Sequence, residues 1–281
     1  MKRKIAEEII MKVLMISATL IIVAALGSIL YSIVAKGIRY LSWEMITSLP
    51  KGGYYFGKEG GVFNAIVGSL YLALGATFLS LVISVPVALY MNVFLRRNGR
   101  AVRTFRFFLD VLWGIPSIVY GAFGFTVMVA LSIRTSLLGG IITVGLFVSP
   151  ILIRAMDEVL QRVPDGIREA AYSMGCTKTE TAFRFFMKKA APGIVTAILL
   201  SFGRAIGDAA VVLLTTGYTD YIPTSLDQQV ATLPLAIFFQ LSSPIEEVQG
   251  RAYASALILT IIILVISLTA RLFTRYIRKN N

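Results

Sequence analysis

Five stretches of this sequence carry no charged side chain and are long enough to cross a membrane. They cover residues 13–35, 60–95, 111–133, 135–153 and 252–270. A sixth stretch, 190–219, is interrupted only by Arg204 and Asp208. A helix needs about 20 apolar residues to cross the hydrocarbon core. The pattern therefore predicts an all-α transmembrane protein, and it excludes a soluble enzyme and a disordered regulator.

The positions of the basic residues decide how these helices are oriented. If 60–95 forms one helix, the side that holds both termini carries 20 of the 27 Lys and Arg residues, and the other side carries 6. Basic loops stay in the cytoplasm, so both termini are predicted to be cytoplasmic. The net charge of +12 is then a sign of membrane topology, and no nucleic-acid partner is expected.

The sequence shows no internal repeat, no low-complexity tract and no soluble domain. Residues 1–281 are therefore predicted to form a single transmembrane domain with a cytoplasmic loop at about 160–190. Its six spans are expected at about 13–35, 63–95, 107–133, 136–153, 191–217 and 252–272. The loops 36–61 and 218–251 are then external. The apolar run 233–241 is too short to span, so we expect an interfacial or re-entrant helix there.

The cytoplasmic loop carries signals for two short helices. Asp165 is placed to start the first helix, and Gly175 is placed to end it in a left-handed conformation. Thr177 and Glu180 have the spacing of a capping box, which would start the second helix. Such a pair is either an amphipathic hairpin lying on the bilayer or an elbow that docks into a partner protein. The residue pattern alone favours the hairpin.

The chain lacks the residues that most enzymes use. It has no histidine and one cysteine, Cys176, which is expected to stay reduced and inert. These counts exclude a His-based or Cys₄ metal site and a Ser–His triad, and no GxxxxGK[ST] loop is present. We expect no metal site and no enzymatic activity. Uphill movement of a solute would need an ion gradient or a separate motor subunit.

Arg204 and Asp208 are charged residues near the middle of a span. A charge at that depth costs about 2.5–3.5 kcal/mol on insertion scales, so both are expected to face protein or water. Their i, i+4 spacing predicts that they share one helical face. They form either a structural ion pair or a site where Arg204 offers its donors to a passing oxyanion. In the second case Asp208 would orient Arg204 or accept a proton.

Polar residues in two other spans leave similar alternatives open. Pro116 and Ser117 are expected to break the third span early, which either exposes backbone groups to a cavity or makes a packing kink. Asn64 either lines a solute path or hydrogen-bonds to a neighbouring helix. Asp110 is expected to pair with the arginines of 96–106.

Part of the cytoplasmic loop resembles a known motif. Glu169-Ala170-Ala171, followed by Gly175 and then by Pro-Gly at 192–193, resembles the EAA loop of ABC-importer permeases. In that family the loop forms coupling helices that sit in a groove of the ATPase subunit. The resemblance therefore implies that Glu169, Ala170, Ala171 and Gly175 couple this chain to a separate ATPase. It favours the docking elbow over the surface hairpin.

Further segments, in order from about residue 40 to the C-terminus, resemble phosphate permeases and among them the A-type, PstA-like subunits. They are 41–44, 65–71, 114–121, 163–166, 203–208 and 233–234. The resemblance implies the six-helix type I ABC-importer permease fold with cytoplasmic coupling helices. It also implies that Arg204 lies in the substrate path, for which Asp208, Ser117 and Asn64 are further candidates. The location implied is a prokaryotic plasma (inner) membrane.

The function expected from this resemblance is ATP-driven import of inorganic phosphate by alternating access. The implied partners are a second, similar permease subunit, two ATP-binding subunits on the cytoplasmic face, an external phosphate-binding protein and membrane lipid. ATP and Mg²⁺ would be bound by the ATPase subunits, and no cofactor is expected in this chain. The alternatives are the same architecture for phosphonate, sulfate or molybdate, a gradient-driven anion carrier or channel, and a scaffold subunit without transport.

Overall fold

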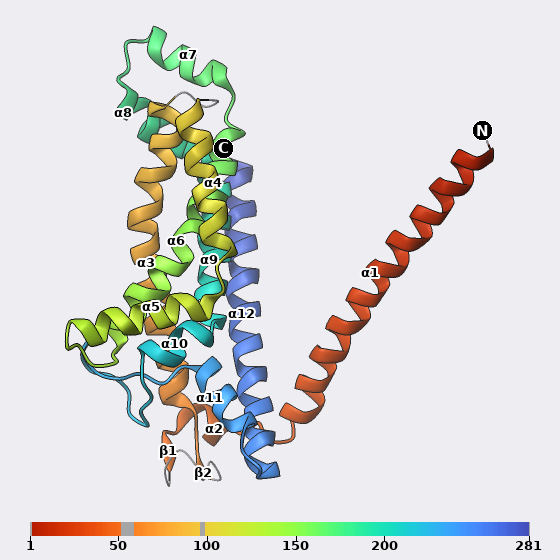
Figure 1. The fold of residues 1–281 in the computed structure, drawn as a ribbon, viewed down its shortest axis with the longest axis vertical. Helices are drawn as coiled ribbons and strands as arrows, with labels where there is room; N and C mark the ends of the chain where they lie inside the picture. Colours follow the sequence, from red (N-terminus) through yellow and green to blue (C-terminus); the bar gives the residue numbers. More distant parts are fainter. Residues whose placement is uncertain (1, 52–58, 96–98, 281) are drawn as a thin grey trace.

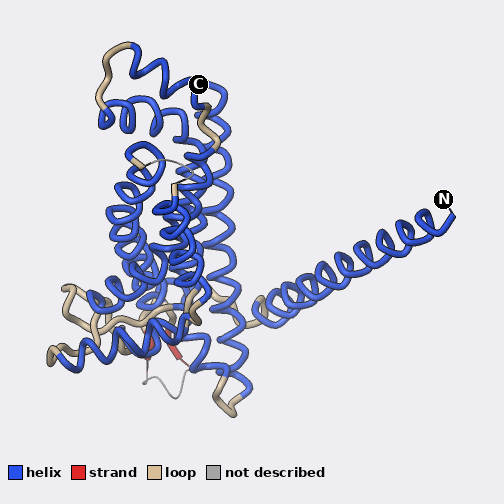
Figure 2. Tube along the Cα trace, turned by 45° about the horizontal axis from the view of Figure 1, so that its top comes forward, coloured by secondary structure: helices blue, strands red, loops and turns tan. Residues whose placement is uncertain are grey.

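The computed structural model describes residues 2–51, 59–95 and 99–280, and most of them are helical (Figure 2). Four long helices form the body of the bundle: α3 (Phe63–Leu89), α6 (Leu137–Gln161), α9 (Met187–Gly207) and α12 (Glu246–Asn280) (Figure 1). The strands β1 (Pro50–Lys51) and β2 (Glu59–Gly60) form one small antiparallel ribbon. Residues 52–58 of the predicted external loop lie outside the described residues.

Five helical segments of the described chain are long and apolar enough to cross a membrane. They are Glu7–Gly37, Phe63–Phe94, Leu137–Gln161, Lys178–Gly207 and Glu246–Leu272. A bent pair, α4 (Arg100–Gly114) and α5 (Ser117–Ala130), makes a sixth if it counts as one span. The predicted all-α transmembrane fold is therefore confirmed.

The third span is broken, as predicted, but the break is much sharper than a kink. α4 and α5 meet at an angle of 91°. Pro116 has no backbone N–H, and both Ile115 and Pro116 have ψ values near those of a strand, 129° and 137°. The helical hydrogen bonds therefore stop at this point. The expected span at 107–133 is therefore not one straight helix, and the bent pair α4–α5 forms either one broken span or a re-entrant segment.

The segment expected as a span at 191–217 is also two helices. α9 ends at Gly207, and α10 (Ala210–Thr215) begins after two residues. The predicted short helix at 233–241 is present as α11 (Leu233–Leu241). The backbone N–H of Leu233, which is fully buried, donates a hydrogen bond of 2.7 Å to Oγ of Ser69 in α3. The first half of α11 is therefore packed into the bundle, whereas Phe238 and Leu241 in its second half are exposed.

Small residues let α3 approach α6 closely. Ala73, Ala76 and Ser80 of α3 are completely buried. Gly145 of α6 lies so close to α3 that a Cβ at this position would be 2.9 Å from Cδ2 of Leu79. Helices in a membrane gain little from the hydrophobic effect when they associate, and such close backbone approach supplies the van der Waals contact instead.

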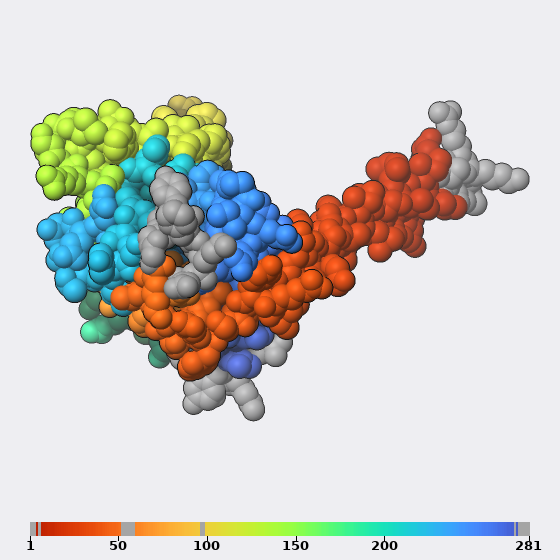
Figure 3. Space-filling view, turned by 90° about the horizontal axis from the view of Figure 1, so that it is seen from below, coloured from red at the N-terminus to blue at the C-terminus, as the bar shows by residue number. Residues whose placement is uncertain are grey.

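α1 (Lys2–Gly37) stands away from the body of the bundle (Figures 1 and 3). It is attached near its C-terminal end, where a Cβ on Gly37 would lie 2.6 Å from the carbonyl oxygen of Tyr253 in α12. Lys36 Nζ also lies 4.7 Å from the centre of the Tyr253 ring. None of the apolar part of α1 is buried inside the chain. Its surface is left for lipid or for another subunit.

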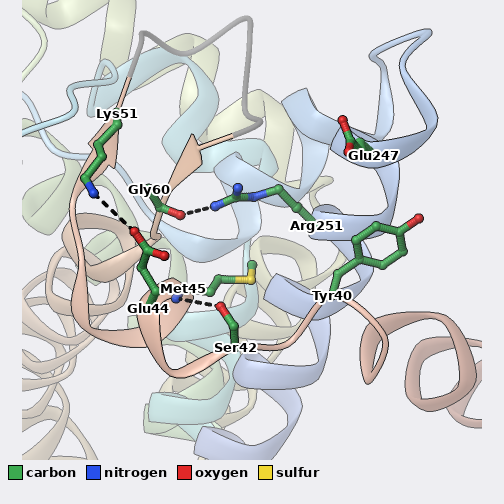
Figure 4. A pocket seen from close by; sticks show the side chains of 8 residues that line it. All are labelled: Tyr40, Ser42, Glu44, Met45, Lys51, Gly60, Glu247 and Arg251. Carbon is green, nitrogen blue, oxygen red and sulfur yellow. Dashed lines mark hydrogen bonds and ion pairs between the residues drawn. The ribbon is translucent and has the colours of Figure 1, made fainter.

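The end of the bundle opposite α7 (Asp165–Ser173) holds a polar cavity of about 470 Å³ between loop 36–61 and α12 (Figure 4). Glu44 pairs with Lys51 at 3.1 Å beside it. Arg251 of α12 donates a hydrogen bond to the carbonyl oxygen of Gly60 in β2. These contacts fold the predicted external loop onto the start of α12.

Gly68 of α3 offers a test of the close packing. A Cβ at this position would overlap the carbonyl oxygen of Ala231, so the backbone would have to shift. We expect Gly68→Ala to destabilise the protein by about 1–3 kcal/mol, as overpacking does. The measurement is the thermal aggregation midpoint in detergent. Gly27→Ala in α1 is the control, because its Cβ would meet nothing within 4 Å. Equal midpoints for both variants would contradict this packing.

Candidate functional site

Arg204 and Asp208 meet at the break between α9 and α10. Nη2 of Arg204 lies 3.4 Å from Oδ2 of Asp208. Asp208 has extended backbone angles, and its Oδ1 accepts a hydrogen bond of 2.9 Å from the backbone N–H of Val211. This is the bond that an N-cap residue makes. The ion pair is present, but the prediction of one shared helical face is wrong, because α9 ends before Asp208.

The two partners of this ion pair differ in exposure. The side chain of Arg204 is 51% exposed, whereas that of Asp208 is 4% exposed. One carboxylate oxygen of Asp208 already accepts the capping hydrogen bond at the start of α10. The guanidinium of Arg204 has five N–H donors in total. Its guanidinium carbon also lies 5.0 Å from the centre of the Phe147 ring in α6, which is a cation–π contact. Arg204 is therefore held on one side by protein and open on the other.

An aromatic pair connects Arg204 to the broken third span. The ring of Phe147 meets the ring of Tyr120 in α5 edge to face, with 5.2 Å between the centres. The hydroxyl of Tyr120 donates a hydrogen bond of 3.0 Å to the carbonyl oxygen of Leu112 in α4. The same carbonyl oxygen accepts a hydrogen bond of 3.3 Å from the backbone N–H of Ile115, at the end of α4. The α4–α5 break and the α9–α10 break thus lie on either side of one aromatic pair.

Ser117 is the first residue of α5, directly after the break. One turn later, Gly121 lies against α10, where a Cβ would be 3.0 Å from the carbonyl oxygens of Ala210 and Val211. Ser117 therefore belongs to the helix that packs beside the Arg204 site. No hydrogen bond joins Ser117 to Arg204 within the described ranges, and its place in a solute path stays a prediction.

Asn64 lies at the start of α3 and is 1% exposed. Its Nδ2 donates a hydrogen bond of 2.8 Å to the carbonyl oxygen of Thr219. The contact fixes the loop after α10 to α3, which supports the alternative that Asn64 bonds to a neighbouring segment. The described residues show no contact between Asn64 and Arg204, so the structure does not bring these two candidates together.

The loop between α6 and α9 starts with the first predicted helix, α7. Gly175 follows it in the predicted left-handed conformation, with φ of 79°. The backbone N–H of Cys176 donates to the carbonyl oxygen of Ala171 at 3.0 Å, and that of Gly175 donates to Tyr172 at 2.9 Å. These two bonds define a Schellman motif. The predicted end of the first helix is confirmed.

The second helix begins with the predicted capping box. The Thr177 hydroxyl accepts a hydrogen bond from the backbone N–H of Glu180, and the Glu180 carboxylate accepts one from the backbone N–H of Thr177. The helix α8 (Lys178–Glu180) continues into η2 (Thr181–Phe186), a π-helix that leads directly into α9. The loop is therefore a folded hairpin joined without interruption to the helix that carries Arg204.

The four predicted coupling residues are not equally accessible. Glu169, Ala170 and Gly175 are exposed on the outside of the hairpin, and Ala171 is completely buried. In this structure Ala171 therefore supports the hairpin from within and does not present a surface to a partner. A contact with an ATPase would be made by Glu169, Ala170 and Gly175.

A buried carboxylate joins three helices below the hairpin, and sequence reasoning missed it. Asp157 of α6 is completely buried. Its carboxylate accepts hydrogen bonds from Arg106 of α4 at 2.8 and 3.0 Å, and from Asn92 of η1 (Tyr90–Phe94) at 2.8 Å. It also accepts one from Arg154 at 3.1 Å. A buried charge is tolerated only with such partners, so these helices are held together at one point.

The Asp157 network extends in two directions. Arg154 also donates to Asp110 of α4 at 2.7 Å. Among the described residues, the partner of Asp110 is thus supplied by α6 and not by the arginines at 100–106, whereas the predicted partners at 96–97 lie outside the described residues. In the other direction, Arg168 of α7 donates to the backbone carbonyl of Asn92 at 2.7 Å. The hairpin is thereby connected to the network.

No sequence pattern marks this network, because its members are distant in the chain. Arg106 is 51 residues and Asn92 is 65 residues from Asp157. Arg154 alone has a helical spacing that could suggest a pair with Asp157. Basic residues just beyond a span are also expected from membrane topology alone, so their presence in the sequence does not indicate a cluster. Only the fold shows that these side chains meet.

This architecture is that of type I ABC-importer permeases. An inward-facing structure of the MetNI methionine ABC transporter matches with a TM-score of 0.62 and 20% identity, covering 77% of this chain and 95% of that chain. The crystal structure of an amino acid ABC transporter with histidines matches with a TM-score of 0.57 and 16% identity, covering 76% and 92%. At these identities the similarity establishes the fold, and the predicted fold class is confirmed.

The chain belongs to the family of binding-protein-dependent transport system inner membrane components, whose sequence profile matches residues 84–280. The phosphate transport system permease protein PstA of Yersinia pestis is 36% identical over 243 residues, which cover 86% of this chain and 81% of that protein. PstA 1 of Mycobacterium tuberculosis (strain ATCC 25618 / H37Rv) is 36% identical over 213 residues, covering 75% and 68%. The predicted family is confirmed, and the chain is a multi-pass transport component.

Asp157 provides a test of the buried network. Asp157→Ala leaves Arg106 and Arg154 without their shared carboxylate, and breaking a buried pair in this way costs about 3–5 kcal/mol. We expect a clear fall in the thermal aggregation midpoint in detergent. Glu158→Ala is the matched control, because the Glu158 side chain is exposed. If both variants melt alike, the network does not hold these helices together.

Proposed function

We propose that this chain is a permease subunit of an ATP-driven importer of inorganic phosphate in a prokaryotic plasma membrane. The observation that supports the proposal most directly is Arg204, a half-exposed guanidinium in an apolar span. Lipid is a poor surrounding for such a charge, so its open side faces water or another subunit. A guanidinium can donate two parallel hydrogen bonds to one oxyanion. The phosphate permeases among the relatives make phosphate the first substrate to test.

Asp208 orients Arg204 in this proposal. Its Oδ1 is held by the cap of α10, and its Oδ2 meets Arg204 at the fairly long distance of 3.4 Å. A charge-assisted hydrogen bond is usually shorter, at about 2.7–2.9 Å. A phosphate oxygen can therefore take the place of Asp208 at the guanidinium without disturbing the cap. Of the two predicted roles for Asp208, orientation fits its contacts better than proton acceptance.

The hairpin α7–α8 lies on the cytoplasmic side in this proposal. The support is the charge count, since 20 of 27 basic residues fall on the side of α7 and both termini. Two ATPase subunits would dock there and bind ATP and Mg²⁺. A second, similar permease subunit would complete the path, and an external binding protein would deliver phosphate to the opposite face. The uncovered apolar surface of α1 suits lipid or the second permease.

The Asp157 network gives the hairpin a mechanical connection to the spans. A movement of α7 acts on η1 through the bond from Arg168 to the Asn92 carbonyl. Asn92 is bonded in turn to Asp157, which holds α4 and α6. ATP-driven movement of the ATPases would therefore shift several spans as a unit. In an alternating-access cycle this movement would open the Arg204 site to one side at a time.

Arg204→Ala tests the site. We expect phosphate uptake at low external phosphate to fall by about 10–100-fold, because a hydrogen bond to a charged group is worth about 1.5–3 kcal/mol. Arg204→Lys keeps the charge but lacks the planar arrangement of donors. Its phosphate uptake should therefore lie between that of Arg204→Ala and that of the unchanged chain. The variants are expressed with their partner subunits in cells that lack other phosphate carriers, and equal assembly is checked by co-purification.

Arg100→Ala serves as the control, because Arg100 is an exposed residue at the start of α4. Normal phosphate uptake by Arg204→Ala would show that the Arg204–Asp208 pair has a structural role and does not bind the substrate. If the unchanged importer takes up no phosphate, competition assays with phosphonate, sulfate and molybdate identify another oxyanion. Transport by this chain alone in liposomes would favour a gradient-driven carrier or channel.

Glu169→Lys tests the coupling surface. Glu169 is exposed on α7, so charge reversal places a repulsive contact in the proposed interface without disturbing a buried partner. We expect about a tenfold loss of co-purifying ATPase subunit, in line with the cost of one unfavourable interfacial charge, together with a loss of uptake. Glu8→Lys on α1 reverses an exposed charge elsewhere on the chain. Normal assembly and uptake with Glu169→Lys would show that α7 does not couple the chain to an ATPase.

A further inference from the structure

One face of α9 is uncovered along most of its length. Arg204, Leu200, Thr196 and Lys189 are all exposed, and they follow one another at intervals of four, four and seven residues. Residues at such intervals lie on one side of a helix. The other sides of α9 are buried in the bundle through Ala190, Ile194, Ala197, Ser201, Phe202, Ala205 and Ile206. The uncovered stripe therefore runs from Arg204 toward the α7 end of the molecule.

The charge of Arg204 indicates what this stripe faces. A half-exposed guanidinium at this depth is unfavourable in hydrocarbon. Thr196 and Leu200 share the face of Arg204, so they have the same surroundings, namely water or another subunit. The charge therefore argues against a lipid-facing surface along this stripe.

The stripe ends in a basic cavity. This cavity has a volume of about 730 Å³ and lies between the end of α6, η2 and the start of α9. Its wall includes Thr196 of the stripe and four basic residues, Arg162, Arg184, Lys188 and Lys189. No Asp or Glu lines it among the described residues, and none of the four cations has an ion pair within 4 Å in that part of the chain. Glu180, one turn before Arg184, is the acidic group that interacts with one of them.

We infer that this basic cavity is a second binding site for the transported anion, between Arg204 and the cytoplasm. The inference rests on the proposed function. Lys189 lies 15 residues before Arg204, which is about 22 Å along a helix. Anion pathways need several weak sites, so that the ion can leave each one. A cluster of cations that have no ion-pair partner within 4 Å in the described part of the chain draws an anion toward it, and so it speeds the departure of phosphate from Arg204.

A basic pocket at the cytoplasmic end of membrane helices can also bind the headgroup of an anionic phospholipid. Such a lipid would lay its acyl chains along the neighbouring helix surface. Here that surface is the face of α9 that carries Thr196, Leu200 and Arg204, and acyl chains there would surround the guanidinium. The position of Arg204 therefore favours the transported anion, and lipid binding becomes an outcome of the test.

The first experiment measures phosphate uptake by the assembled importer with Lys188→Gln/Lys189→Gln. We expect the maximal rate to fall about tenfold, the low end of the effect of such focused charge. The external phosphate concentration that gives half this rate should stay unchanged, because the external side of the site is intact. Lys188→Arg/Lys189→Arg should restore the rate. The control Lys4→Gln/Lys12→Gln removes two exposed charges of α1, on the same side of the predicted topology.

The second experiment tests whether the stripe is accessible to water. Thr196→Cys is placed in a Cys176→Ser background, so that it is the single thiol of this chain. Inside-out vesicles of the assembled importer are treated with a membrane-impermeant, anionic methanethiosulfonate. We expect modification of Thr196→Cys, and a slower reaction when Lys188→Gln/Lys189→Gln is added. Ile21→Cys on the apolar surface of α1 should not react. No reaction at Thr196→Cys would overturn the inference.

The outcomes separate this inference from the proposed function. If the unchanged importer takes up no phosphate, the proposed function fails and the inference fails with it. If the unchanged importer takes up phosphate and the double Gln variant equals it in maximal rate, the inference alone is overturned. Loss of co-purifying anionic phospholipid from that variant, with normal uptake, would assign the cavity to lipid.

Discussion

The cost of an ionised side chain in hydrocarbon governs the structure around Arg204. A guanidinium in an apolar segment needs partners, and the fold places Arg204 near the end of α9, beside two interrupted helices. The break between α9 and α10 places Asp208 beside Arg204 as a helix cap. On its other side, Phe147 of α6 lies against the guanidinium, and Tyr120 of α5, which follows the break between α4 and α5, packs on Phe147. The guanidinium is thereby held by protein on one side and half-exposed on the other.

Asp157 meets the same constraint in a different way. It is completely buried, and it is neutralised and hydrogen-bonded by Arg106, Arg154 and Asn92. Such a cluster has little freedom to rearrange, because removing any member leaves an unpaired buried charge or polar group. The two charged sites therefore suit opposite tasks. The open pair near α10 suits exchange of an anion, and the closed cluster near α7 suits transmission of a movement as a unit.

Local chemistry made much of this fold predictable. Uncharged stretches indicate helices that cross a membrane, and Gly175, Thr177 and Glu180 indicate where the hairpin stops and restarts, because these effects act within a few residues. The angle at Pro116 was beyond prediction, since it depends on the packing of α5 against α10. The partners of Asp157 were hidden for a similar reason: they come from helices distant in the chain. Arg204 was identified as a candidate, but the exposed cavity beyond it required the structure.

The most direct test of the central claim is an electron cryo-microscopy structure of the assembled importer, trapped with phosphate inside the membrane. We predict that phosphate oxygens lie within about 2.7–2.9 Å of the Arg204 guanidinium nitrogens, the distance of a charge-assisted hydrogen bond. Asp208 should still cap α10. Phosphate bound away from Arg204, with Arg204 still paired to Asp208, would contradict a role for Arg204 in the path.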